Sequence, residues 1–170
     1  RYSMISLQIE DIKSFMNKLL LKPDFDAFLL VEGTVTTCNT FHIDGEIKPG
    51  YYTKEEEEAL GLLGRRFSRW QELRPFCLDL IKGKRTPLNF RFTFKLSGEN
   101  TEKLLEQTGS AFSPQDISGL FLNVRYDSSG LFCTTATALT LFTMDKSLEH
   151  YWDQMVQKFL LRQEIAFTLL

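Results

Sequence analysis

The chain has 170 residues, of which 43% are hydrophobic and 25% charged, and a formal net charge of −2. This composition is typical of a folded globular protein and excludes an intrinsically disordered chain, because disorder accompanies few apolar residues and a large net charge. The small net charge also excludes a uniformly basic coat for nucleic acid. The length predicts one domain with a single hydrophobic core.

No apolar run approaches the roughly 18 residues that a membrane-spanning helix needs, and no short apolar stretch follows a basic start. We therefore expect a cytoplasmic protein without membrane contact. The three cysteines, Cys38, Cys77 and Cys133, form no CxxC pair. An odd number of cysteines without an export signal predicts reduced thiols rather than a structural disulfide.

The N-terminal part predicts a strand followed by an amphipathic helix. Apolar and polar residues alternate over residues 5–9, as in a half-buried strand. Asp11 can cap a helix whose apolar residues from Ile12 to Leu20 share one face, and Pro23 prevents its continuation. The other face of this helix carries three basic residues: Lys13, Lys18 and Lys22.

Paired strands are expected next. Residues 25–31 and 34–47 are rich in Val, Thr, Phe and Ile, which favours two strands joined by a turn at Glu32-Gly33. A second turn at Asp44-Gly45 can divide the later run, and Pro49-Gly50 closes this part of the chain.

Residues 53–83 predict two helices that form an insertion. Thr53 followed by Glu56 is a capping-box pattern, and the acidic first turn suits the N-terminal end of a helix. Apolar residues from Trp70 to Ile81 form the buried stripe of a second helix. Pro75 within it predicts a kink or a fresh helix start, and Gly83 is a natural end.

The remaining residues repeat the order strand, helix, strand, hairpin, strand and then add a helix. Alternating phenylalanines define the first strand, an Asp-Ser-Ser-Gly turn defines the hairpin, and a serine cap opens the last helix. The expected elements are strands at 90–96, 120–126 and 131–144, helices at 99–108 and 147–160, and an optional strand within 163–170.

The two halves of the chain share residues as well as this order. Ala27–Val31 matches Gly119–Val124, and Thr36–Phe41 matches Thr134–Leu139. A β-α-β-β-β unit used twice, with helices on one side of an antiparallel sheet, resembles one domain of a DNA sliding clamp. The resemblance implies an α+β fold and a single clamp-like domain over residues 4–160. Its parts are a first repeat at about 4–48, the helical insertion at 53–83, a second repeat at about 88–145 and the C-terminal helix at 147–160.

A closer likeness involves the segment Trp70–Leu88. With its Leu73-Arg74-Pro75-Phe76-Cys77 run, this segment is similar to an uncharacterised bacterial family known only as a domain of unknown function. That likeness implies no activity.

The sequence departs from the clamp pattern in its second repeat. Clamp helices line a ring and present Lys and Arg to the DNA backbone, but the second helix here carries Glu99, Glu102 and Glu106 against one Lys103. A surface that faces phosphates should not be acidic. A clamp ring also closes six such domains, so this chain would need six copies.

Basic residues are unevenly distributed and supply the candidate binding site. From Arg65 to Lys95 there are nine basic residues against two acidic ones, and Lys82-Gly83-Lys84-Arg85 can meet a phosphate with little rearrangement. The same cations would also serve a helix end and solubility. The candidates for binding phosphate or nucleic acid are Lys13, Lys18, Lys22, Arg65, Arg66, Arg69, Lys82, Lys84 and Arg85.

A metal site is the second candidate. His42, Asp44 and Glu46 fall at i, i+2 and i+4, so on a regular strand they share one face and could ligate a divalent cation. The alternative is a polar, solvated sheet face that is interrupted by the Asp44-Gly45 turn. No cofactor is expected.

The sequence favours binding over catalysis. It contains no GxSxG, HExxH or P-loop pattern, and with two histidines the usual general base is scarce. We therefore expect a non-catalytic binding module, an accessory in nucleic-acid transactions that contacts DNA or RNA. The alternatives are a protein-interaction or homo-oligomerisation module that uses exposed sheet edges, and a metal-dependent enzyme that uses His42, Asp44 and Glu46.

Overall fold

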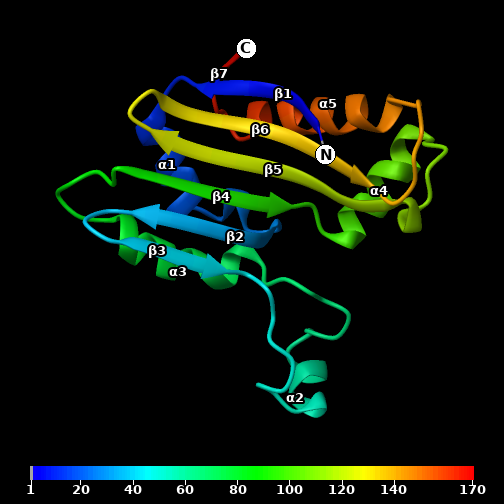
Figure 1. Ribbon diagram of the computed structural model, residues 1–170, viewed down its shortest axis with the longest axis horizontal. Coiled ribbons are helices and arrows are strands. Elements are labelled where there is room, and N and C mark those ends of the chain that lie inside the picture. Colours follow the sequence, from blue (N-terminus) through cyan, green and yellow to red (C-terminus); the bar gives the residue numbers. More distant parts are fainter. Residues whose placement is uncertain (1) are drawn as a thin grey trace.

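The computed structural model describes residues 2–170 and contains one seven-stranded antiparallel sheet in the order β3-β2-β4-β5-β6-β1-β7 (Figure 1). The α+β class and the antiparallel sheet are therefore confirmed. The strands are β1 Tyr2–Ile9, β2 Leu29–Thr36, β3 Thr40–Asp44, β4 Asn89–Lys95, β5 Ile117–Asp127, β6 Gly130–Leu139 and β7 Phe167–Leu169. The helices are α1 Ile12–Leu20, α2 Lys54–Ala59, α3 Trp70–Ile81, α4 Gly98–Thr108 and α5 Ser147–Arg162, with 3-10 turns at Pro23–Phe25 and Pro114–Asp116.

Helices cover only one face of the sheet. In Figure 1 the viewer looks onto the uncovered face, and α1, α3 and α5 lie behind it. Alternation along β4 shows the division, since Phe90, Phe92 and Phe94 are buried while Arg91 is exposed. We call the uncovered side the open face.

The covered face holds the hydrophobic core. Phenylalanine rings of β4 pack against Trp70 of α3, with centroids 5.1 Å from the Phe92 ring and 5.0 Å from the Phe94 ring. Both tryptophans are fully buried, and each satisfies its indole N–H: Trp70 Nε1 donates to the Leu19 carbonyl (2.8 Å) and Trp152 Nε1 to the Phe121 carbonyl (2.9 Å). These bonds tie α3 to α1 and α5 to the sheet.

Two of the expected helix caps are present, but the serine cap expected for the last helix is not, because α5 already includes Ser147 and its N-cap residue Lys146 forms no side-chain cap hydrogen bond. Asp11 caps α1, and Thr53 forms a capping box with Glu56 at the start of α2. Helix α3 continues through Pro75 without a fresh start, and Glu72 completes its N-terminal cap by accepting from the Arg69 amide (2.8 Å). None of the helices found between residues 2 and 170 is long and apolar enough to cross a membrane.

The expected turn at Glu32-Gly33 is absent, because β2 runs straight through these residues and turns only at 37–39. Gly33 instead pairs with Phe92, and a Cβ atom at Gly33 would lie 2.5 Å from that ring. The glycine is required by close packing rather than by a turn.

The structure does not confirm the duplicated clamp-like unit. Both halves contain strand, helix and hairpin in that order, and they join in one continuous sheet. Only the hairpins β2·β3 and β5·β6 correspond, however: β4 pairs with β5 of its own half, whereas β1 pairs with β6 and β7. The last strand of the expected β-α-β-β-β unit is also missing from both halves, since β3 is followed by α2 and β6 by α5.

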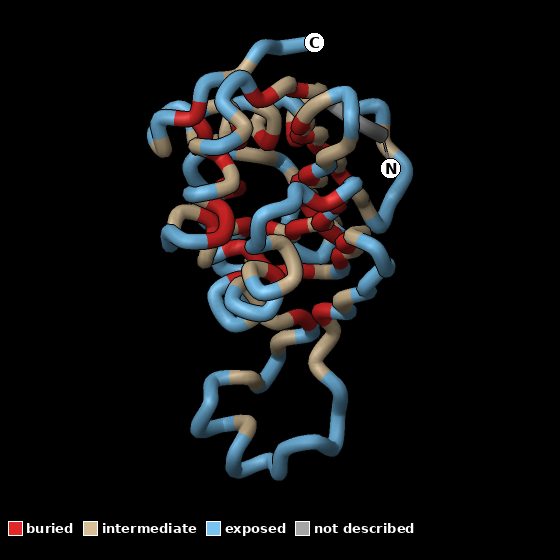
Figure 2. Tube along the Cα trace, turned by 90° about the vertical axis from the view of Figure 1, so that its left-hand side faces the viewer, coloured by how far each residue is buried: buried red, intermediate tan, exposed pale blue. Residues whose placement is uncertain are grey.

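Residues 48–64 project from the body of the molecule. Figure 2 shows them as a loop of mostly exposed residues below the core, and α2 within them has no buried residue. The base of this arm is held to the body because the Ile47 amide donates to the Arg66 carbonyl (2.8 Å) and Glu46 bridges to Phe67. We call residues 48–64 the acidic arm.

Candidate functional site

Seven of the predicted phosphate-binding cations fall into two groups at opposite ends of α3. The first group lines a groove that lies between α1 and the loop after α3, and consists of Lys13, Lys82, Lys84 and Arg85. The second group precedes α3 and lines a hollow at the edge of the open face; it consists of Arg65, Arg66 and Arg69. The structure therefore does not bring all the predicted cations onto one surface.

The other two predicted cations lie on α1. Lys18 Nζ donates to the backbone carbonyls of Gln163 and Glu164, the latter at 3.0 Å, where α5 ends. A cation suits the carbonyl end of a helix, so Lys18 has a structural role. Lys22 is exposed.

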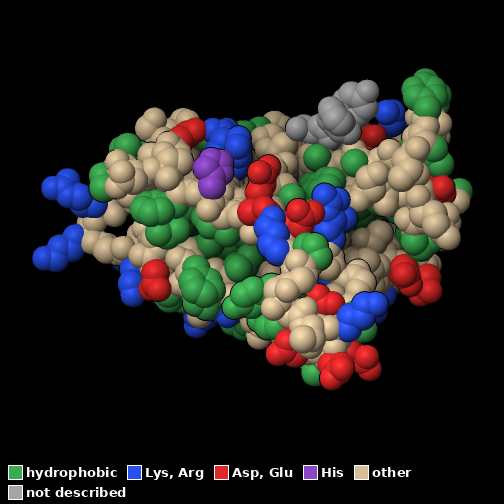
Figure 3. Space-filling view, turned by 60° about the horizontal axis from the view of Figure 1, so that its bottom comes forward, with side chains coloured by type: hydrophobic (Ala, Val, Ile, Leu, Met, Phe, Trp, Pro, Cys, Tyr) green, Lys and Arg blue, Asp and Glu red, His purple; other side chains and the backbone are tan. Residues whose placement is uncertain are grey.

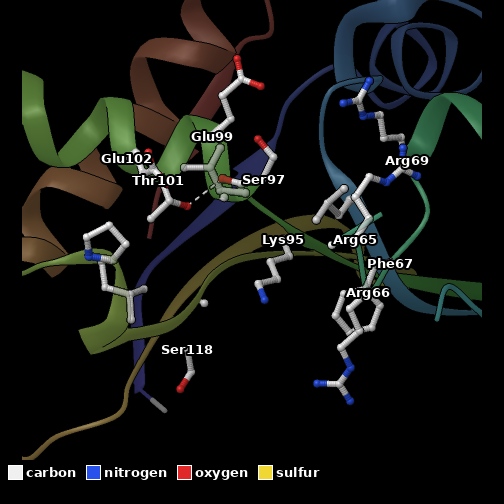
Figure 4. Close-up of a pocket in the computed structure, with 17 residues that line it drawn as sticks. Arg65, Arg66, Phe67, Arg69, Lys95, Ser97, Glu99, Thr101, Glu102 and Ser118 are labelled. Carbon is white, nitrogen blue, oxygen red and sulfur yellow. Dashed lines mark hydrogen bonds between the residues drawn. The ribbon is translucent and has the colours of Figure 1, made fainter. Parts of the chain in front are cut away.

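The hollow beside Arg65, Arg66 and Arg69 has a volume of about 410 Å³. It lies where β4 ends and α4 begins, so Lys95, Ser97 and Gly98 form part of its wall. Figure 4 shows the Lys95 side chain directed into the hollow between Ser118 and Arg66. The hollow therefore gathers cations from two segments that are far apart in the sequence, while Glu99 and Glu102 of α4 line its other side.

Lys95 is a partly buried cation in the wall of the hollow. Burial lowers the pKa of Lys95, and the nearby Arg66 guanidinium lowers it further. Its ammonium lies 5.6 Å from the centroid of Phe67, and the Arg66 guanidinium lies 5.0 Å from the same ring. Across residues 2–170, no carboxylate forms an ion pair with Lys95. An anion entering the hollow would supply the missing countercharge.

Two arginines of the hollow already form ion pairs with carboxylates. Arg65 pairs with Glu72 (2.7 Å) and Arg66 with Glu46 (2.8 Å). The Nε atom of Arg65 is buried and has no hydrogen-bond partner among the described residues. The pairs position the two arginines beside the hollow and leave donor capacity unused.

The open face carries two further cations that the sequence did not single out as site residues. Arg91 of β4 and Arg125 of β5 lie directly opposite each other in the register. Arg125 pairs with Asp127, whereas Arg91 has no ion pair within the described chain. Like charges directly opposite on neighbouring strands repel each other; Asp127 offsets this repulsion at Arg125, whereas Arg91 has no such partner among the described residues.

Aromatic and amide groups accompany these cations. The Arg125 guanidinium lies 4.8 Å from the centroid of Phe132, a half-buried ring on the open face of β6. Between Arg91 and Lys95, the Thr93 hydroxyl donates to Asn123 Oδ1 (2.8 Å). The centre of the open face is thus polar and of mixed charge: Arg91, Arg125 and Lys95 lie on β4 and β5, and the exposed carboxylate of Glu32 on β2 lies opposite Thr93.

The structure does not bring the predicted metal ligands together. His42 and Asp44 share the open face of β3, but β3 ends before Glu46. The alternation breaks because a Cβ atom at Gly45 would lie 1.8 Å from the Leu30 carbonyl oxygen, so the backbone approaches β2 closely there.

Both carboxylates of this candidate site form ion pairs with basic side chains. Lys48 Nζ donates to Asp44 (2.6 Å), and hydrogen bonds from Lys48 and the Glu46 amide lower the pKa of Asp44. Glu46 pairs with Arg66. No cluster of three potential metal ligands occurs among residues 2–170.

The cysteines carry free thiols, in agreement with the prediction. Cys38 is exposed, whereas Cys77 and Cys133 are buried. Burial raises the pKa of each buried thiol to about 12, so neither forms the thiolate that nucleophilic chemistry needs.

Comparison with known proteins gives a family but no activity. The family model described as a family of unknown function (DUF5721) matches residues 18–168. No curated protein and no solved structure matches the chain. The family match confirms the expected likeness to an uncharacterised domain. Since it spans most of the sequence, the chain belongs to this family of unknown function.

Proposed function

We propose that the chain is a non-catalytic module that binds single-stranded nucleic acid across the open face, along β4 and β5. The observation that carries this proposal is the pair Arg91 and Lys95 on one face of β4, neither of which forms an ion pair with a carboxylate of residues 2–170, although Glu32 lies across from Thr93 between them. Four residues of strand separate them by roughly 13 Å. Two cations at this separation can contact phosphates on one strand, with release of bound counterions.

The surroundings of this pair suit a single strand better than a duplex. The open face is a flat sheet without a helix that could enter a groove (Figure 1). The half-buried ring of Phe132 lies beside Arg125 at one end of the row, and aromatic rings next to basic side chains are the usual platform for unpaired bases. Thr93 and Asn123 offer hydrogen-bonding groups between Arg91 and Lys95.

A clamp-like arrangement would place nucleic acid on the opposite side of the sheet. In clamps the helices face DNA, so Lys13 and Lys22 of α1 would then make the contacts. The acidic surface of α4 and the use of Lys18 at the end of α5 count against that arrangement. The charge-reversal variants described next distinguish binding on the open face from binding on α1.

The test is fluorescence anisotropy with labelled single-stranded DNA and RNA oligonucleotides, and with a duplex, at several salt concentrations. We expect affinity for single strands that falls steeply with salt. Arg91→Glu with Lys95→Glu should weaken binding at least tenfold and reduce the salt slope by about 1 for each lost phosphate contact. The matched control, Lys13→Glu with Lys22→Glu, makes the same change of charge on α1 and should have little effect. Equal losses in both variants, or no binding of any nucleic acid at low salt, would remove the proposal.

Sheet edges are a weaker candidate for protein interaction. The two edge strands are β3, with five residues, and β7, with three. Short edges offer few unpaired backbone groups, which limits pairing with another chain. Protein interaction is therefore better sought elsewhere on the molecule.

A further inference from the structure

The acidic arm exposes apolar side chains that its own chain leaves uncovered. Tyr51 is 80% exposed, Leu60 54% and Leu63 56%. The arm is nevertheless ordered, because the Thr53 capping box starts α2 and the backbone bond at Ile47 fixes its base. Exposed aromatic and aliphatic groups on a segment with defined backbone structure are typical of an interaction element.

A complementary groove lies on another part of the molecule. It has a volume of about 600 Å³, and its apolar wall includes Ile12, Met16, Leu78 and Ile81. Four cations form the rim: Lys13, Lys82, Lys84 and Arg85. We call it the basic groove.

The charges of the two surfaces are opposite. Residues Glu55–Glu58 make the arm acidic, whereas in the rim of the groove only Lys82 is paired, with Asp79. Figure 3 shows acidic side chains gathered on the arm and basic side chains projecting at the far end, where the loop after α3 lies. Both surfaces combine an apolar centre with a charged border, and the borders attract each other.

The arm and the basic groove of one chain do not meet. The arm leaves the body near the start of α3, and the groove lies beyond its end, about 18 Å away for a 12-residue helix. In Figures 1 and 2 the arm also points away from the body. A contact between the two surfaces therefore requires a second copy of the chain.

We propose that the acidic arm of one molecule docks in the basic groove of a second molecule, so that the chain associates head to tail. Because the two surfaces differ, each molecule keeps one free arm and one free groove, and association continues until a ring closes or a filament forms. This inference does not depend on the proposed function, since the nucleic-acid site uses the open face.

Sedimentation velocity of the full chain at increasing concentration tests the proposal. A small interface predicts dissociation constants of about 1 μM to 1 mM and species larger than dimers at the upper end. The arm variant Glu55→Gln, Glu58→Gln, Leu60→Ser leaves the Thr53–Glu56 cap intact. The groove variant is Lys84→Gln with Arg85→Gln. All five side chains are exposed, so both variants should fold, and each alone should associate at least tenfold more weakly.

Mixing the variants gives the sharper result. The arm variant retains an intact groove and the groove variant retains an intact arm, so a mixture has one competent contact and should give one-to-one dimers and nothing larger. A second check is a charge exchange within one chain, Glu55→Lys and Glu58→Lys with Lys84→Glu and Arg85→Glu, which should restore association.

Three outcomes overturn the proposal. The first is a wild-type chain that stays monomeric up to about 1 mM. The second is association that neither variant weakens. The third is a monomeric chain whose groove variant loses affinity for single-stranded oligonucleotides, which would assign the basic groove to nucleic acid. Loss of binding in the Arg91 and Lys95 variant alone concerns the proposed function and leaves head-to-tail association unaffected.

Discussion

The two faces of strand β4 differ in their side chains and in what these side chains contribute to stability. On the covered face, Phe90, Phe92 and Phe94 are almost fully buried in an aromatic core. On the open face, Arg91 and Lys95 occupy the alternate positions and find no carboxylate partner among the described residues. Burial of apolar rings stabilises the fold, whereas unpaired cations do not. The comparison indicates that the covered face maintains the structure and that the open face is available for a ligand.

The largest expected effect comes from the covered face. Phe92→Ala removes a fully buried ring that packs on Trp70 and Phe90, and should lower the free energy of unfolding by about 3–5 kcal/mol. Urea unfolding followed by tryptophan fluorescence measures this change. Thr93→Ala, on the open face of the same strand, should cost less than about 1.5 kcal/mol, the typical value of one hydrogen bond. Equal losses in the two variants would contradict the division of the strand.

A second effect tests the helix layer. Arg74 of α3 holds Asp26 with two hydrogen bonds of 2.8 Å, and both side chains are mostly buried. Arg74→Ala should cost about 2–4 kcal/mol, because it leaves a carboxylate in a poorly solvated site.

The control is a pair on the solvated side of the molecule. Lys48→Ala breaks the exposed pair with Asp44 and should leave the urea midpoint nearly unchanged. If Arg74→Ala together with Asp26→Asn is as unstable as Arg74→Ala alone, the stranded carboxylate is not the cause of the loss.

A third effect concerns the glycine that faces the core. Gly33→Ala places a methyl group 2.5 Å from the Phe92 ring, so the ring has to move and the cost should be about 1–3 kcal/mol. The same measurement on Thr34→Ala, one residue further on the open face, should show a smaller loss. Combining Gly33→Ala with Phe92→Leu should recover part of the stability, because it removes the clashing ring; a purely additive loss would show that the ring is not responsible.

Local signals in the sequence predicted the helices well. The apolar stripe from Ile12 to Leu20 and the Thr53–Glu56 capping box each depend on residues that are close in the sequence, and both are observed. The predicted turn at Glu32-Gly33 was wrong. The glycine is needed there because it packs against the ring of Phe92, which is 59 positions away in the sequence (92 − 33). Strand neighbours have no local signal either, so the place of β1 between β6 and β7 could not be read from the sequence.

The candidate site was predictable only in part. The basic composition of 65–95 drew attention to Arg65, Arg66 and Arg69, which do line the hollow. In the sequence, Lys95 has the pattern of a solvated strand residue. In the structure, the pairing of β2 with β4 and the bridge from Leu29 to Arg69 place it beside Arg66. The opposition of Arg91 and Arg125 depends on the register of β4 and β5, which no spacing in the sequence states.

The smallest expected effect has the opposite sign and compares the two faces most directly. Arg91→Thr removes the like-charge contact with Arg125 and should raise the free energy of unfolding by about 0.2–1 kcal/mol, while it weakens binding of a single-stranded oligonucleotide. Urea unfolding at low salt and at about 1 M salt separates the cause, because salt screens repulsion between exposed charges and should abolish the gain. A threonine at a covered position of β4, by contrast, would only lower the free energy of unfolding. A variant that loses stability at both salt concentrations would show that the Arg91 side chain stabilises the sheet. Arg91 would then not be a residue that lowers stability in favour of ligand binding.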